Sequence, residues 1–334
     1  MNNIQTSKEL LPLPETTWWS RNNKHVFWVI LVVLLALVPV FLNKPFHLHL
    51  LINTFIFIVA TLSMRTIIIS NQFPLGHAAF MAVGAYTAAE LSVRLDWPMW
   101  ATIPTGAIVT CIAGTLFAIP FSRLRTLYYA MGSLFFGVLV IYIVRASTFL
   151  GGYGGLGGVE PLFIGGKKVP DYYFFLALTL VCAIAMYRFE FSRIGISLKA
   201  IAQSHDVASS VGINEARYRV LVVGVGCFFV GLIGATFAHY NRMVAINSFE
   251  LMTTLMFVIY MLVGGIGSFA GPFVGTPIMF LIPEYLRELK EYSPFIAAFL
   301  VLLFVFFLPK GLVGLIKDAF SKYKSRRQGE IPRY

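Results

Sequence analysis

Long runs of apolar residues, separated by short polar stretches, follow one another along most of the chain. Many runs reach the roughly 20 predominantly apolar residues that a helix needs to cross a membrane. They are unbroken, whereas the strands of an outer-membrane barrel alternate apolar and polar residues. The pattern therefore predicts an all-α, polytopic membrane protein with about ten transmembrane helices. The predicted spans are 26–42, 48–69, 75–93, 97–120, 127–149, 172–187, 219–240, 251–267, 271–287 and 295–315.

The composition agrees with this pattern. Of the 334 residues, 58% are apolar and 12% charged, and the mean hydropathy is +0.78, which excludes an ordinary soluble domain and a disordered chain. Cys111, Cys182 and Cys227 all lie in apolar runs without a CxxC spacing. We therefore expect neither a disulfide framework nor a zinc site, and no cofactor.

Basic residues outnumber acidic ones, 26 to 15, for a net charge of +11. In so apolar a chain they are first of all topology signals, because Lys and Arg gather in cytoplasmic loops. We thus expect a lipid bilayer, and no nucleic acid, as a partner. With the N-terminus inside, 18 of the 26 basic residues are cytoplasmic, which favours cytoplasmic N- and C-termini. The predicted division is a cytoplasmic tail at 1–25, a transmembrane domain at 26–316 and a basic cytoplasmic tail at 317–334.

The segment from Asn71 to Tyr86 interrupts the apolar pattern. It introduces Pro74, Gly76 and His77, followed by a series of small residues. Irregular backbone at membrane depth is tolerated only inside protein or beside a watery cavity, so one interpretation is a broken helix next to a solute path. The other is a simple cytoplasmic turn, in which His77 is a first-turn residue that satisfies backbone groups.

Two further segments are rich in glycine. Gly267, Gly271 and Gly275 recur every four residues, a spacing that lets two helix backbones approach closely. The run Gly151–Gly158 lacks the Gly-Lys-Ser/Thr ending of a phosphate-binding loop, so we interpret it as an external loop. No metal-ligand spacing and no Ser, His and acid arrangement stands out in the sequence, and we predict a protein that is not an enzyme.

A polar, basic segment of about thirty residues separates the sixth and seventh predicted spans. From Leu198 onward, Leu198, Ile201, Ala208 and Val211 recur at helical steps, which predicts a short amphipathic helix ending near Gly212. Such a helix either lies along the membrane surface or docks into a groove of another protein.

Five motifs, in this order along the chain, resemble a known family. They are Leu75-Gly76-His77 to Ala88, the run Gly151–Gly158, Ser192-Arg193-Ile194-Gly195 with Lys199-Ala200-Ile201 and Gly212-Ile213-Asn214, Gly264-Gly265-Ile266-Gly267-Ser268 with Gly271-Pro272, and Leu308-Pro309-Lys310-Gly311-Leu312. The chain resembles the permease subunits of branched-chain amino acid ABC importers, of the LivM type.

This resemblance implies an inverted-repeat importer permease in the bacterial inner membrane. The implied partners are two cytoplasmic ABC ATPase subunits, a second permease subunit and an external solute-binding protein. The segment 192–218 then couples the permease to the ATPase. The residues implied in ATPase coupling are Arg193, Gly195, Lys199, Ala200, Asp206, Ala208 and Gly212. Those implied in the translocation path or in helix packing are Gly76, His77, Gly84, Tyr86, Gly264, Gly265, Gly267 and Gly271.

The chain departs from the family pattern at His205, where an acidic residue is usual, and at Asn71 and Pro74, where Gly and Ser are common. The implied solutes are branched-chain or other amino acids; alternatives are urea, short amides and small aromatic acids. A different class, a self-sufficient channel or secondary transporter, would use ionisable groups within the membrane. The only acidic residues in the predicted spans are Glu90 and Glu284, both near span ends, which argues against proton coupling.

Overall fold

The computed structural model describes residues 34–39, 44–124, 126–163, 168–285 and 311–315, together with positions 299, 302, 306 and 318. Residues 34–39 are helical. The elements that follow are α2 (Pro45–Ile68), α3 (His77–Leu95), α4 (Met99–Phe121), α5 (Thr126–Ala146), η1 (Gly152–Gly154), β1 (Leu156–Gly157), α6 (Lys168–Glu190), α7 (Arg193–Gln203), α8 (His205–Ser210), α9 (Glu215–Asn241), β2 (Met243–Val244), η2 (Ile246–Phe249), α10 (Leu251–Gly264) and α11 (Gly271–Tyr285).

Eight of the ten predicted spans coincide with helices, namely α2 to α6 and α9 to α11. The spans at 26–42 and 295–315 and both predicted tails lie largely outside the described residues. Within the described part, six segments are long and apolar enough to cross a membrane: α2, α4, α5, α6, α9 and the η2–α10 segment Ile246–Gly264. The protein is therefore a helical, multi-pass membrane protein.

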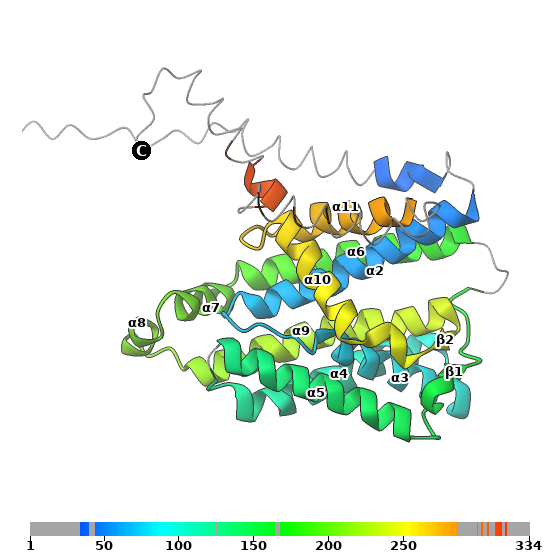
Figure 1. Ribbon diagram of the computed structural model, residues 1–334, viewed down its shortest axis with the longest axis horizontal. Helices are drawn as coiled ribbons and strands as arrows, with labels where there is room; N and C mark the ends of the chain where they lie inside the picture. The colour runs from blue at the N-terminus through cyan, green and yellow to red at the C-terminus, as the bar shows by residue number, and fades with distance from the viewer. Residues whose placement is uncertain are drawn as a thin grey trace, which may run out of the picture.

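The helices form two groups that meet along α2 and α9 (Figure 1). In the first group, α3 and α4 pack against each other and against α9, and α5 packs on α3. In the second group, α2 packs on α6 and α11, and α10 packs on α11. About 78% of the apolar window of α2 is buried, against 28% for α5. The core thus surrounds α2 and α9, and α5 leaves much of its apolar surface for lipid or a partner.

The two ends of the bundle differ in structure (Figure 1). The short helices α7 and α8 project from one end, which we call the α7–α8 end. At the other, the β1–β2 end, Leu156 pairs with Val244 and Gly157 with Met243 in a short antiparallel ladder. Pro45 begins α2 at this end, where its missing N–H costs nothing, and α9 ends there at Arg242, which adopts a left-handed conformation with φ 58°.

The group of α3, α4 and α9 is held together by backbone contact. A Cβ on Gly84 of α3 would lie 2.3 Å from the carbonyl oxygen of Gly231 in α9, and one on Gly234 would lie 2.2 Å from the carbonyl oxygen of Met81. Only glycine fits at both crossings, as expected where membrane helices pack through small residues. Gly84 is one of the residues implied in the translocation path or in helix packing, and it lies at this crossing.

We expect Gly84→Leu to destabilise the bundle by at least about 2 kcal/mol, because neither backbone at the crossing has room to yield. Thermal unfolding of the purified protein in detergent measures the effect. Ala177→Leu on the exposed face of α6 is the matched control and should leave the unfolding temperature unchanged. Equal stability of the two variants would mean that α3 and α9 do not meet in this way.

Candidate functional site

The turn between α6 and α7 has a fixed geometry. The Ser192 hydroxyl donates to the carbonyl oxygen of Phe189 over 2.6 Å and accepts from the backbone N–H of Gly195 over 3.4 Å, so it caps the N-terminus of α7. A Cβ on Gly195 would lie 2.0 Å from the carbonyl oxygen of Glu190. Glycine is therefore required where α7 folds back against the last turn of α6.

The predicted amphipathic helix is two helices. It begins at Arg193 rather than near Leu198, and it breaks at Ser204, whose extended backbone ends α7 and whose hydroxyl caps α8 at the Val207 N–H. The predicted end at Gly212 is confirmed: Gly212 has φ +80°, its N–H donates to Ser209, and the Ile213 N–H donates to Ala208. These bonds form a glycine C-cap.

The two faces of α7 and α8 differ from the prediction in one respect. Leu198, Ile201 and Ala208 are buried in the bundle, but Val211 is 71% exposed. Ile196 and Val207 are also exposed, at 63% and 65%. The periodicity alone does not show which side of a helix faces the rest of the chain. The prediction therefore grouped the exposed Val211 with three buried residues. We call Ile196, Val207 and Val211 the exposed apolar surface of α7–α8.

The other predicted coupling residues lie around this surface. Arg193 at the start of α7 and Asp206 in α8 are exposed, and Ala200 is partly buried. The backbone carbonyl of Asp206 accepts from the hydroxyls of Ser209 and Ser210, which strengthens the short helix α8. Lys199 points instead toward Glu190.

A buried cluster of charges joins α7 to the bundle. The Arg65 guanidinium near the end of α2 donates to both carboxylate oxygens of Glu190 at the end of α6, one of the two bonds being 3.0 Å long. Lys199 of α7 lies 3.0 Å from the same carboxylate. Arg65 also donates through Nε to the carbonyl oxygen of Ile266, in the loop between α10 and α11, over 3.2 Å. We call Arg65, Glu190 and Lys199 the ion triad.

The triad is energetically important because its central pair is sealed from solvent. The side chains of Arg65 and Glu190 are each 4% exposed. Removing one partner of such a pair leaves a buried, uncompensated charge and typically costs about 3–5 kcal/mol. The ends of α2 and α6, the start of α7 and the α10–α11 loop are thus held as one unit.

The apolar pattern of the sequence did not predict this triad. The predicted sixth span ended at residue 187, whereas α6 continues to Glu190, so only Glu90 and Glu284 were acidic residues in the predicted spans. The sequence did contain one signal for the triad, Arg65, which lies inside an apolar run. Ionisable residues at such positions are normally paired, so a buried acidic partner could have been expected.

His77 begins α3 as a buried residue. It is a first-turn residue, as one interpretation predicted, but its Nε2 bonds the Ser63 hydroxyl of α2 over 2.9 Å. The backbone N–H groups nearby are satisfied by other helices: Leu75 donates to Ser133 of α5 over 2.9 Å and Ala78 donates to Thr254 of α10 over 3.0 Å. The start of α3 is therefore a polar junction among α2, α5 and α10 inside the protein.

Gly76 and Tyr86, two further residues implied in the path or in packing, are enclosed by protein. A Cβ on Gly76 would lie 2.0 Å from the carbonyl oxygen of Ser133, so α5 presses directly on this turn. Tyr86 is 4% exposed, and its hydroxyl has no hydrogen-bond partner within the described residues. Gly76 lines a small cavity of about 20 Å³ between α5 and α10.

The second glycine segment joins α10 to α11. A Cβ on Gly264 would lie 2.0 Å from the carbonyl oxygen of Gly271, and one on Gly275 would lie 2.0 Å from that of Tyr260. Gly265 in the turn has φ +109°. The predicted ladder is wrong at Gly267, which lies in the turn before α11 with open space around it. The close approach involves Gly264, Gly271 and Gly275 instead.

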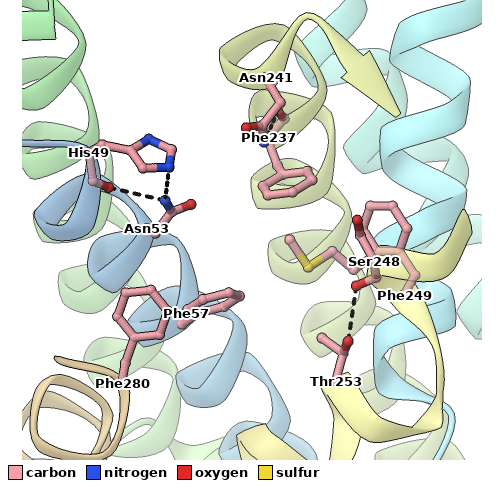
Figure 2. A pocket seen from close by; sticks show the side chains of 10 residues that line it. His49, Asn53, Phe57, Phe237, Asn241, Ser248, Phe249, Thr253 and Phe280 are labelled. Carbon is pink, nitrogen blue, oxygen red and sulfur yellow. Dashed lines mark hydrogen bonds between the residues drawn. The ribbon is translucent and has the colours of Figure 1, made fainter. Parts of the chain in front are cut away.

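A cavity of about 350 Å³ lies between the two helix groups, toward the β1–β2 end (Figure 2). Its α2 wall carries His49, Asn53 and Phe57, and the facing wall comes from α9, η2 and α10. The residues that line it are His49, Asn53, Phe57, Met81, Phe237, Asn241, Ser248, Phe249, Thr253 and Phe280.

The α2 wall of the cavity is a preorganised polar network. Asn53 donates through Nδ2 to the carbonyl oxygen of His49 over 3.1 Å and to Nε2 of the same residue over 3.0 Å. The proton of His49 therefore sits on Nδ1, which donates to the Tyr240 hydroxyl over 2.6 Å. Lys168 approaches that hydroxyl to 3.5 Å from outside the cavity. Both amide hydrogens of Asn53 are used, and its oxygen remains as an acceptor.

No sequence motif identified the cavity residues. They come from six helical elements, α2, α3, α9, η2, α10 and α11, which tertiary packing brings together. The one local signal was a pair of polar residues, His49 and Asn53, four positions apart in an apolar span and hence on one helix face. In the described residues, no group of three His, Cys, Asp or Glu is placed to hold a metal ion.

A bundle of membrane-crossing helices around a partly polar cavity is typical of membrane transport proteins. The chain belongs to the family of branched-chain amino acid transport system permease components, whose model matches residues 46–308. It is thus a permease subunit of an ABC transporter, in which separate subunits supply the ATPase activity, and members of the family work with ATPase and binding-protein partners.

Two relatives are named as the high-affinity branched-chain amino acid transport system permease protein LivM. The protein of Salmonella typhimurium is 25% identical over 306 residues, which cover 83% of this chain and 72% of the relative. That of Escherichia coli is 24% identical over 336 residues, which cover 92% of this chain and 79% of the relative. No solved structure matches the chain significantly.

The α10–α11 turn provides a matched pair of substitutions. Gly271→Leu should lower the unfolding temperature of the purified protein in detergent by several degrees, because a Cβ on Gly271 already lies 2.4 Å from the carbonyl oxygen of Gly265. Gly267→Leu, four residues earlier, has open space and should change it little. Equal effects of the two variants would contradict the close approach of α10 and α11.

Proposed function

We propose that this chain is one of two permease subunits of an importer for branched-chain or other amino acids in the bacterial inner membrane. It pairs with a second permease subunit, binds two cytoplasmic ATPase subunits and receives its solute from an external binding protein. The family match and the names of the two LivM relatives support this solute class. The proposal includes ten spans in an inverted-repeat arrangement and both termini in the cytoplasm.

The α7–α8 end is the cytoplasmic end in this proposal. The excess of Lys and Arg on that side of the predicted spans supports the orientation, because basic residues are retained inside. The β1–β2 end then faces outward, toward the binding protein. The cavity, which lies nearer that end, is then on the side from which solute arrives.

We assign the coupling to α7 and α8. Their exposed apolar surface, formed by Ile196, Val207 and Val211, is the kind of ridge that docks into a groove of a partner protein. Ala208 lies on the buried side of α8, and Gly212 follows the end of this helix. Gly195 allows α7 to pack closely against the end of α6. Arg193 and Asp206 are the exposed charges beside it.

The observation that carries the proposal is the ion triad. A helix that transmits movement must be fixed to what it moves, and Lys199 of α7 shares the Glu190 carboxylate with Arg65 of α2. Through the bond from Arg65 to Ile266, the α10–α11 loop joins the same unit. Displacement of α7 by the ATPase thus acts directly on α2 and on the α10–α11 turn.

Val207→Asp combined with Val211→Asp should weaken ATPase binding by at least about tenfold, because two exposed apolar contacts become desolvated charges. Co-purification of the ATPase with the permease complex measures the effect. Leu95→Asp, at an exposed position of the β1–β2 end, is the control and should leave ATPase binding intact.

Two results would contradict the proposed coupling. One is full ATPase binding and solute uptake by the Val207 and Val211 variant at wild-type rates. The other is full uptake by this chain alone in liposomes without any ATPase subunit, which would indicate a self-sufficient transporter.

A further inference from the structure

The cavity at the β1–β2 end suits one chemical class of ligand. Of the ten described residues that line it, none is Asp, Glu, Lys or Arg. Phe57, Met81, Phe237, Phe249 and Phe280 make most of the wall apolar. None of these lining residues offers a counter-charge to a charged side chain of a ligand, whereas an aliphatic side chain would be stabilised by the apolar wall.

The polar atoms stand on opposite walls (Figure 2). On the α2 wall, the hydrogen bonds of the Asn53 side chain within the described residues are both made by its Nδ2, to His49, and its oxygen accepts none of them. Across the cavity, Asn241 uses Nδ2 to donate to the carbonyl oxygen of Phe237, which leaves its second hydrogen for a ligand. Ser248 lies on the same side, next to Thr253, whose hydroxyl donates to the Ser248 carbonyl.

We propose that this cavity is a binding site for a small zwitterion with an apolar side chain, an aliphatic α-amino acid. Asn53 accepts from the ammonium group, Asn241 and Ser248 donate to the carboxylate, and the Phe and Met side chains enclose the aliphatic part. The volume of about 350 Å³ lies at the small end of the roughly 300–1,000 Å³ typical of small-molecule sites. This proposal rests on the proposed function, because it assumes that the imported solute passes through this chain.

The preorganised wall explains how the site recognises an amino group. The Asn53 amide is fixed by two hydrogen bonds to His49, and His49 is fixed by Tyr240. The acceptor oxygen therefore does not need to be ordered on binding, which reduces the entropic cost of recognition. Asn53→Ala removes the acceptor and leaves the His49–Tyr240 bond in place.

The test is protection of a cysteine inside the cavity. Thr253→Cys is introduced into a chain whose three native cysteines are replaced by serine, and the intact importer complex is placed in lipid nanodiscs without ATP. Alkylation by a small maleimide is timed with and without L-leucine. At a leucine concentration of about twice its dissociation constant, labelling should slow about threefold, since the free fraction is 1/(1 + [L]/Kd). L-Lysine and L-glutamate should give no protection.

Met252→Cys is the matched control, because Met252 is adjacent in α10 but 62% exposed and not part of the cavity wall. Its labelling rate should not respond to leucine. With Asn53→Ala in addition to Thr253→Cys, protection should need about tenfold more leucine, the effect of losing one charge-assisted hydrogen bond.

Other outcomes overturn the proposal. Labelling of Cys at 253 at the same rate with and without leucine, equal protection by lysine, or a cysteine closed to the reagent would each exclude an amino acid site here. The same measurements separate the cavity site from the proposed function. Protection by leucine in a complex that takes up no leucine would support the cavity site and refute the importer role. Leucine uptake without protection would support the importer role and refute the cavity site.

Discussion

The buried pairing of Arg65 with Glu190 is the constraint on which the rest of the structure depends. It closes the ends of α2 and α6 against each other with almost no solvent contact, and one of the two carboxylate oxygens that Arg65 bonds is shared with Lys199 of α7. Two cations donate to the single Glu190 carboxylate, and the Nε of Arg65 donates to the Ile266 carbonyl. An apolar pair would fill the same space, but it would not direct three separate segments toward one point.

The same helices that meet at the triad also form the walls of the cavity. At one end, α2 carries Arg65; about four turns away along the same helix, it carries Asn53 and His49. The α10–α11 loop is bonded to Arg65, and α10 and α11 contribute Thr253 and Phe280 to the cavity. In the proposed coupling, a shift of α7 is transmitted along the stiff helices α2, α10 and α11 to the cavity at the opposite end. The proposed ATPase contact and the proposed solute site are thus joined without a flexible linker.

Much of this fold follows from sequence, since eight predicted spans match helices and the stop at Gly212 is a local backbone property. The family resemblance is confirmed by the match over residues 46–308. What sequence reasoning missed depends on tertiary packing. Periodicity grouped Val211 with Leu198 because it carries no information on which face the bundle covers. The glycine spacing included Gly267 because a repeat does not reveal where a helix begins. The triad and the cavity join residues far apart in the chain.

If the Arg65–Glu190 pair transmits ATPase movement, its loss should lower the amount of leucine transported per ATP hydrolysed, and this ratio can be measured directly. Arg65→Met with Glu190→Met removes both charges together, so the bundle keeps an apolar contact and its fold. In the reconstituted complex we expect ATP hydrolysis to continue while transport per ATP falls severalfold. The matched control, Glu90→Met with Arg94→Met, alters a partly exposed ion pair at the other end and should keep the ratio. An unchanged ratio in the Arg65 and Glu190 variant would contradict the account.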